Sequence, residues 1–161
     1  QLRWGECYIR RFKQRLYLLH VDSGDAALQA PIAWNSARDL HLADRSYLRC
    51  EIGEKSTALK KEPTAPKKEP TAPKKEPSRE PFIFTVSFRQ GGERCKPLKR
   101  RHSQTLKKLL QEYALEPWLR DRVPLIYYQQ ELVAVGDLFL CESEFVRSYP
   151  AVSFSWLEDK R

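Results

Sequence analysis

A proline-rich repeat in the middle of the chain limits the folds open to the rest of the sequence. The heptapeptide KKEPTAP occupies residues 60–66, recurs at residues 67–73 and decays into KKEPSREP at residues 74–81. A proline inside a helix costs about 3 kcal/mol, so two prolines per unit exclude a coiled coil despite the seven-residue period. The repeat predicts an extended, polyproline-like spacer of at most about 3.1 Å per residue. Its lysine pairs could contact an anion, but a solvated linker is the favoured interpretation.

Short strands are expected before this spacer. Residues 6–12 and 15–21 are rich in apolar and aromatic side chains, and residues 13–14 between them predict the turn of a hairpin. Residues 22–25 supply polar turn residues that end the hairpin. Residues 47–52 alternate apolar and polar side chains, which is typical of a half-buried strand.

More strands are expected after the spacer. Residues 82–88 predict a strand with Phe84, Val86 and Phe88 on one face. Gly91-Gly92, shortly after these residues, ends the alternating pattern of this strand. The doublet indicates a turn that needs a permissive backbone. A meander with turns at residues 129–130 and 136–137 and a last alternating strand are also expected, at residues 125–128, 132–135, 138–141 and 152–156.

One helix is expected between the strands. Its apolar residues are spaced i, i+3, i+4 and i+7, at Leu106, Leu109, Leu110 and Tyr113. Ser103 is placed to cap its beginning, Pro117 to end it, and Lys107 and Lys108 lie off the apolar stripe. The sequence therefore predicts an α+β fold, a small mixed sheet or sandwich with one principal helix.

Basic residues are concentrated in one window of the chain. The sequence contains 29 Lys and Arg against 21 Asp and Glu, a formal net charge of +8, and residues 89–108 contain eight of these cations and one acid. They are Arg89, Arg94, Lys96, Lys99, Arg100, Arg101, Lys107 and Lys108. A loop beside a helix N-terminus, with forked Arg donors and Lys point charges, suits phosphate, so the window favours a polyanion ligand. The alternative is that the cations only solvate a loop, opposite acids elsewhere.

The segment Pro117-Trp118-Leu119-Arg120-Asp121-Arg122 leaves two interpretations open. Arg120 and Arg122 could be two more phosphate contacts. Alternatively, Asp121 between two arginines forms a salt-bridged corner that holds the helix to the meander, and this structural role is favoured. Trp118 is more typical of a core anchor than of a base-stacking platform.

Other classes of site are not indicated. Four scattered cysteines, Cys7, Cys50, Cys95 and Cys141, form no CxxC pair, so free and mostly buried thiols are expected rather than a metal site. The sequence has no P-loop, no Rossmann fingerprint, no Ser-Gly-Gly-x-Asp-Ser loop and no G-x-S-x-G elbow, so neither a catalytic residue nor a cofactor site is predicted.

The ends and hydropathy of the chain give two further expectations. The chain opens on Gln1 and contains no Met, so a fragment or processed form of a longer protein is expected. No apolar run approaches the roughly 20 residues of a membrane span, and no signal peptide opens the chain, so a cytoplasmic protein that does not contact membranes is expected.

A set of motifs resembles the C-terminal domain of bacterial tRNA(Ile)-lysidine synthase. The motifs are FRQGGER at 88–94, LKKLLQE at 106–112, PWLRDRVPL at 117–125, ELVAVG at 131–136 and VSFSW at 152–156. IRRF at 9–12 with LYL at 16–18 is similar to the hairpin that closes the middle, substrate-recognition domain of that family. The match is loose over residues 1–22 and close over residues 82–161.

The resemblance implies a function for the parent enzyme. That enzyme uses ATP, with Mg²⁺, to join lysine to C2 of the wobble cytidine of the CAU-anticodon isoleucine tRNA, so that the tRNA reads AUA instead of AUG. Its catalytic pyrophosphatase-loop domain is not in this chain. The C-terminal domain is similar to a tRNA-binding domain of the phenylalanyl-tRNA synthetase β subunit and is expected to contact the acceptor-stem region.

The resemblance also implies an organisation of this chain. Residues 1–22 would be the hairpin remnant of the middle domain, residues 23–59 the first strands of the C-terminal domain, residues 60–81 a linker and residues 82–161 the tRNA-recognition domain. A KKEPTAP array is not usual in the family. The basic window and the matched motifs together give the tRNA contacts expected: Arg89, Arg94, Lys96, Lys99, Arg100, Arg101, Lys107, Lys108, Arg120 and Arg122. Of these, Lys99, Arg100 and Arg101 lie in a loop that varies in the family and are expected only from their local charge. The alternative is an interaction or homodimerisation module that uses the exposed face of the meander at residues 124–141.

Overall fold

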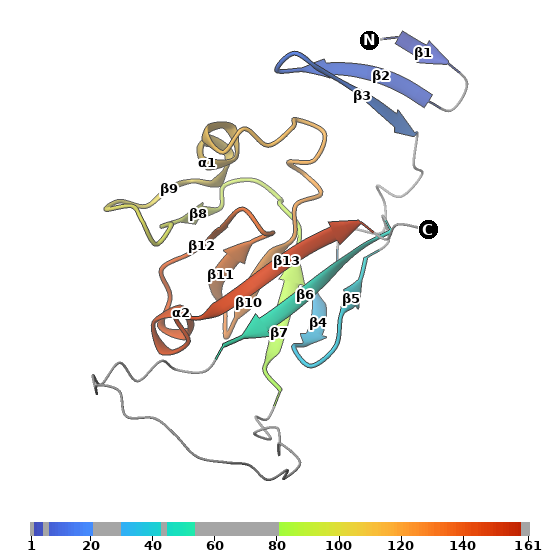
Figure 1. Ribbon diagram of the computed structural model, residues 1–161. Helices are drawn as coiled ribbons and strands as arrows, with labels where there is room; N and C mark the ends of the chain where they lie inside the picture. The colour runs from blue at the N-terminus through green and yellow to red at the C-terminus, as the bar shows by residue number, and fades with distance from the viewer. Residues whose placement is uncertain (1, 5–6, 21–29, 43–44, 54–80, 159–161) are drawn as a thin grey trace, which may run out of the picture.

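The computed structural model describes residues 2–4, 7–20, 30–42, 45–53 and 81–158 (Figure 1). The turn predicted at residues 22–25 and the spacer up to residue 80 lie outside the described residues. Within the described ranges, no helix is both long enough and apolar enough to cross a membrane.

The predicted N-terminal hairpin is confirmed. Strand β2 (Cys7–Phe12) pairs with β3 (Arg15–His20), and a further strand, β1 (Leu2–Trp4), adds to the free edge of β2. Lys13 and Gln14 between them have φ values of 44° and 63°. Positive φ at both central residues is the signature of the two-residue turns that match the twist of a hairpin.

Two antiparallel sheets form the body of the molecule (Figure 1). The larger has the order β12-β11-β10-β7-β4 and the smaller the order β13-β6-β5. Their strands are β4 (Ile32–Asn35), β5 (Leu40–His41), β6 (Ser46–Ile52), β7 (Ile83–Ser87), β10 (Leu125–Tyr128), β11 (Glu131–Val135), β12 (Phe139–Leu140) and β13 (Val152–Glu158). Because β4 pairs with β7 and β6 with β13, both sheets combine strands from the two sides of the spacer.

The main core lies between these two sheets. Phe84 and Val86 of β7 are fully buried there, as the alternation of residues 82–88 predicts, and Phe154 of β13 packs on Phe84 with ring centroids 5.3 Å apart. Leu48 of β6 and Trp34 of β4 complete the same cluster. The predicted strands and meander are confirmed, and together the sheets form a sandwich.

A second core lies on the other face of the larger sheet, beneath α1 (Leu106–Glu112). Leu106, Leu109 and Leu110 are all fully buried, so the helical stripe is confirmed for these residues. Leu125 belongs to this cluster and its neighbour along β10, Ile126, to the main core. The larger sheet is therefore covered on both faces.

The predicted ends of α1 are wrong. Thr105, not Ser103, occupies the N-cap position and makes no side-chain cap, because the chain is still extended through β9 up to that residue. The helix ends at Glu112 rather than at Pro117, since Ala114 turns into positive φ (60°). Tyr113 is thus the C-cap residue, 38% exposed, instead of a core residue.

A second, shorter helix was not predicted. Helix α2 covers Glu144–Ser148, and Ser143 caps it by accepting a hydrogen bond from the Val146 N–H at 3.2 Å. Phe145 and Val146 close one end of the sandwich core. The expected α+β arrangement of sheets with one principal helix is confirmed.

Candidate nucleic-acid interface

The basic window folds into a small hairpin next to α1. Strands β8 (Arg94–Cys95) and β9 (Gln104–Thr105) pair antiparallel, so residues 96–103 form the loop that joins them. Gly91 and Gly92 lead into β8 with φ values of 107° and 87°, which confirms that the doublet serves a turn.

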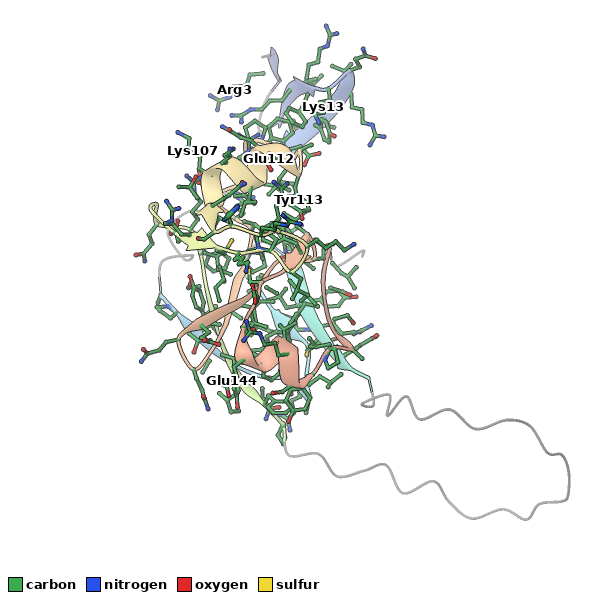
Figure 2. All side chains as sticks on the ribbon, turned by 90° about the vertical axis from the view of Figure 1, so that its left-hand side faces the viewer. Arg3, Lys13, Lys107, Glu112, Tyr113 and Glu144 are labelled. Carbon is green, nitrogen blue, oxygen red and sulfur yellow. The ribbon has the colours of Figure 1, made fainter. Side chains whose placement is uncertain are left out.

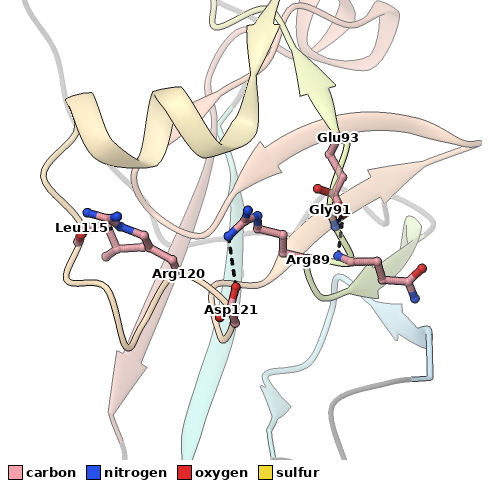
Figure 3. Close-up of polar contacts among 7 residues, drawn as sticks. Arg89, Gly91, Glu93, Leu115, Arg120 and Asp121 are labelled. Atoms are coloured by element: carbon pink, nitrogen blue, oxygen red, sulfur yellow. Dashed lines mark hydrogen bonds and ion pairs between the residues drawn. The ribbon is translucent and has the colours of Figure 1, made fainter.

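Glu93 fixes the turn that precedes the hairpin (Figure 3). Its Oε1 accepts hydrogen bonds from the backbone N–H groups of Gln90 and Gly91, at 2.6 and 2.8 Å. Desolvation acts to raise the pKa of Glu93, but these backbone bonds and the nearby charge of Arg89 outweigh it and hold the pKa below its usual value. The backbone carbonyl of Glu93 also accepts the N–H of Leu106 at 2.8 Å. The first N–H of α1 is therefore engaged within the protein, and the use of this helix N-terminus for phosphate stays a prediction.

The base of the loop is anchored to the edge of the larger sheet. The Leu98 N–H donates to the Leu140 carbonyl at 3.1 Å, and the Glu142 N–H donates to the Lys96 carbonyl at 2.7 Å. Pro97, which is buried, bridges to Cys141 between these two bonds. One side of the loop thus continues the sheet beyond β12, while the tip projects from it.

Three of the predicted site residues are engaged by two glutamates. Lys96 Nζ lies 2.5 Å from Glu142 Oε2, and Arg100 Nη2 lies 2.6 Å from Glu112 Oε2. Lys108 is more loosely held, with Nζ 4.0 Å from Glu112 Oε1. Hydrogen bonds from Lys96 and Arg147 lower the pKa of Glu142, so this carboxylate stays charged. These cations serve in part to hold the loop and α1 in place.

The remaining cations of the hairpin and α1 face solvent. Lys99, Arg101 and Lys107 are exposed and make no ion pair with a carboxylate of the described residues. Arg94 is also exposed, and its Nη2 lies 3.4 Å from the Ser103 carbonyl. Lys107 points away from the domain (Figure 2). We call Arg94, Lys99, Arg101 and Lys107 the basic surface.

The other predicted site residues belong to a structural corner (Figure 3). Arg89 Nη1 lies 3.0 Å from Asp121 Oδ1, and the Arg120 Nε donates to the Leu115 carbonyl at 3.0 Å. Arg122 is half-buried and has a partner within the protein. Of the two interpretations left open for residues 117–122, these contacts favour the structural one.

Trp118 joins the N-terminal hairpin to this corner. Its ring lies 5.1 Å from that of Tyr17 and 6.1 Å from that of Phe12, both edge to face, and the Arg10 guanidinium lies 5.5 Å from its centroid. The Tyr17 hydroxyl donates to Glu116 Oε1 at 2.8 Å. Trp118 is therefore an anchor, as predicted, but for the hairpin rather than for the core.

Comparison with known proteins decides the family. Residues 84–156 match the family model described as the TilS substrate C-terminal domain. A tRNA(Ile)-lysidine synthase from Coxiella burnetii is 39% identical over 135 residues, which are 83% of this chain and 26% of that protein. This chain belongs to the tRNA(Ile)-lysidine synthase family.

Further tRNA(Ile)-lysidine synthases align over the same extent. One from Vibrio vulnificus is 32% identical over 148 residues, 87% of this chain and 28% of its own length. One from Methylococcus capsulatus is 32% identical over 144 residues, 89% of this chain and 29% of its own length. The resemblance seen in the motifs is confirmed, and the chain spans less than a third of these relatives.

Sequence reasoning alone missed two groups of residues in this domain. Glu112 and Glu142, which engage the loop cations, lie outside the charged window, and only their contacts show their role. Lys13, in the turn of the N-terminal hairpin, is exposed at the same end of the molecule as α1 (Figure 2), and Arg11 of β2 is also exposed. Residues 1–22 contain more basic than acidic side chains, which could have pointed to these two cations. Residues 1–59 taken together are nearly neutral, so this local excess was not noticed.

The thiols of this domain are free, as predicted. Cys95 and Cys141 are buried side by side, and the hydrogen bond between them together with burial raises the pKa of Cys141. Burial likewise raises the pKa of Cys50 to about 12. Thiols with raised pKa values remain protonated and are poor nucleophiles.

The described residues do not fit the ATP and Mg²⁺ that the family implies. The chain lacks a phosphate-binding loop, and no three His, Cys, Asp or Glu side chains of the described ranges are grouped so as to hold a metal ion. We therefore assign no chemical step to this chain.

Proposed function

We propose that this chain is the tRNA-recognition, C-terminal part of a tRNA(Ile)-lysidine synthase. The observation that carries the proposal is that some cations of the basic window, residues 89–108, form ion pairs with carboxylates, whereas others are exposed and form none. Lys96 and Arg100 are paired within the domain, whereas the basic surface of Arg94, Lys99, Arg101 and Lys107 is exposed. Cations that no carboxylate of the described residues neutralises are the ones able to replace counterions along a phosphate backbone.

The parent enzyme supplies the chemistry in this proposal. It would use ATP to join lysine to C2 of the wobble cytidine of the CAU-anticodon isoleucine tRNA and so change the codon read from AUG to AUA. The catalytic domain would hold ATP and Mg²⁺, and the present chain would hold the acceptor-stem region of the same tRNA in the cytoplasm. The likeness to a tRNA-binding domain of the phenylalanyl-tRNA synthetase β subunit is part of this proposal.

A salt titration tests the proposal. Binding of the CAU-anticodon isoleucine tRNA is measured by fluorescence anisotropy over a series of salt concentrations, with a methionine tRNA as the comparison. Four phosphate contacts predict a slope of log K against log salt of about −3 to −4. A flat slope would contradict a phosphate interface.

A second function, dimerisation, has its own supporting observation. The predicted surface, the exposed face of the meander at residues 124–141, stays a prediction, although its central strands are covered on both faces and the Leu98 N–H bonds along the edge of β12. The two most exposed large apolar side chains of the described residues are on the hairpin, where Leu16 and Leu18 are 74% and 67% exposed. Sedimentation at several protein concentrations tests this function, and a monomer at all concentrations would exclude it.

A further inference from the structure

A cavity of about 480 Å³ lies at the α2 end of the sandwich. Glu144, one of its lining residues, lies at the opposite end of the domain from Lys107 (Figure 2). The cavity is therefore separate from the basic surface, and the proposed contact with tRNA does not use it.

Aromatic rings form much of the cavity wall. Phe82, Tyr128, Phe145 and Tyr149 all line it. The Phe82 ring lies 4.9 Å from that of Tyr149 and 5.9 Å from that of Tyr128, at interplanar angles of 64° and 81°. The rings thus meet edge to face and together form an aromatic wall of the cavity. The face of an aromatic ring carries partial negative charge, which attracts cations.

Two carboxylates add negative charge to the same cavity. Glu131 and Glu144 both line it and are exposed. Glu131 Oε2 accepts the backbone N–H of Glu144 at 3.0 Å, which fixes this side chain beside the cavity. Neither carboxylate makes an ion pair with a cation of the described residues. This differs from Glu142 and Asp121, which pair with Lys96 and Arg89 in a chain of net charge +8.

We propose that this cavity binds a primary alkylammonium group carried on a short aliphatic chain. Its methylenes would pack against the Phe82 and Tyr149 rings, and its ammonium would approach the ring faces and the two carboxylates. Glu131 and Glu144 would repel an anion, and a neutral apolar ligand would make no favourable electrostatic contact with them. The same chemistry could come from a free diamine or from the lysine pairs that precede Phe82 in the sequence, at residues 60–61, 67–68 and 74–75.

The test uses the full chain and a linear diamine, 1,5-diaminopentane, followed by NMR chemical shifts of residues 128–131 and 144–149. The neutral 1,5-pentanediol has the same length and is the matched control. Saturable shifts with the diamine, and none with the diol at equal concentration, are expected. Equal shifts with both compounds would overturn the proposal, because they would show an apolar cavity without charge recognition.

Variants separate the contribution of the carboxylates. Glu131→Gln keeps an oxygen to accept the Glu144 N–H and, combined with Glu144→Gln, is expected to weaken diamine binding about fivefold to tenfold. The control, Glu51→Gln combined with Asp137→Asn, removes the same two charges from exposed positions outside the cavity lining and should leave binding unchanged. Equal weakening in this control would show that only net charge matters and would also overturn the proposal.

A last variant identifies the source of the ammonium. Six Lys→Gln changes, at residues 60–61, 67–68 and 74–75, remove the tethered lysines but leave the cavity intact. If tethered lysines occupy the cavity, diamine binding becomes tighter in this variant; if they do not, binding is equal in both chains. Absence of diamine binding in both chains would overturn the proposal, and none of these outcomes depends on binding to tRNA.

Discussion

The hydroxyl of Tyr17 donates a hydrogen bond to Glu116 Oε1 at 2.8 Å, across 99 positions of sequence. Beside it, the Tyr17 and Trp118 rings meet edge to face with centroids 5.1 Å apart. These contacts dock the N-terminal hairpin on the corner that also holds Arg89 against Asp121. The hairpin and the basic surface are therefore attached to one end of the same domain.

We expect Trp118→Leu to release the hairpin without unfolding the sandwich. The change removes two aromatic pairs, each worth about 0.5–1.5 kcal/mol, so amide exchange in β2 and β3 should become faster by about tenfold or more. Hydrogen-exchange mass spectrometry measures this effect. Tyr17→Phe should act in the same direction, and Tyr113→Phe, at an exposed tyrosine outside the joint, is the control. Unchanged exchange in Trp118→Leu would mean that the hairpin is held by other contacts.

We expect the open and the engaged cations to differ in their effect on tRNA binding. The triple variant Lys99→Gln, Arg101→Gln, Lys107→Gln should reduce the magnitude of the salt slope by roughly 2 to 3, because three phosphate contacts are lost. The matched triple variant removes the same charge from the paired cations, at Lys96, Arg100 and Lys108. It should reduce the magnitude of the slope by about 1 or less. Equal slopes in the two variants would show that only net charge matters.

We expect acid to loosen the loop at residues 96–103 through Glu142. Its pKa is lowered in the folded protein, so its ion pairs stabilise the fold fully above the unfolded pKa and are lost as the pH falls through the folded value. NMR shifts of Lys96 and Arg147 recorded from about pH 6 down to about pH 3 should follow this titration. Glu142→Gln should remove the transition, and its persistence in that variant would assign it to another carboxyl group.

We expect the domain to fold when the spacer is shortened, but not when the spacer and all strands before it are removed. Deleting residues 67–73 should change the free energy of unfolding by about 0.3 kcal/mol, because loop-closure entropy depends only weakly on length. A chain that begins at residue 81 would lose β4 and β6, which pair with β7 and β13, and should fail to fold cooperatively. Circular dichroism melting curves distinguish the two. A cooperative transition in the truncated chain would contradict this.

Most of the strands and the helix that could be predicted from the sequence were recognised from the spacing of apolar residues over a few positions. The alternation at residues 82–88 placed Phe84 and Val86 in the core, and the spacing of Leu106, Leu109 and Leu110 placed the buried face of α1. The motifs also indicated the family. Period and turn residues act over a few positions, which is why they can be recognised in a single sequence.

The tertiary structure alone decided which cations are open. Lys96 and Lys99 are both lysines of the same loop, but of these two only Lys96 forms an ion pair with Glu142. The same holds for the hairpin, whose attachment depends on Trp118 lying opposite Tyr17. Ion pairs and ring contacts between residues far apart in the chain depend on how the sheets bring them together. The sequence by itself thus determined a basic, strand-rich domain, and the fold determined which part of its charge faces outward.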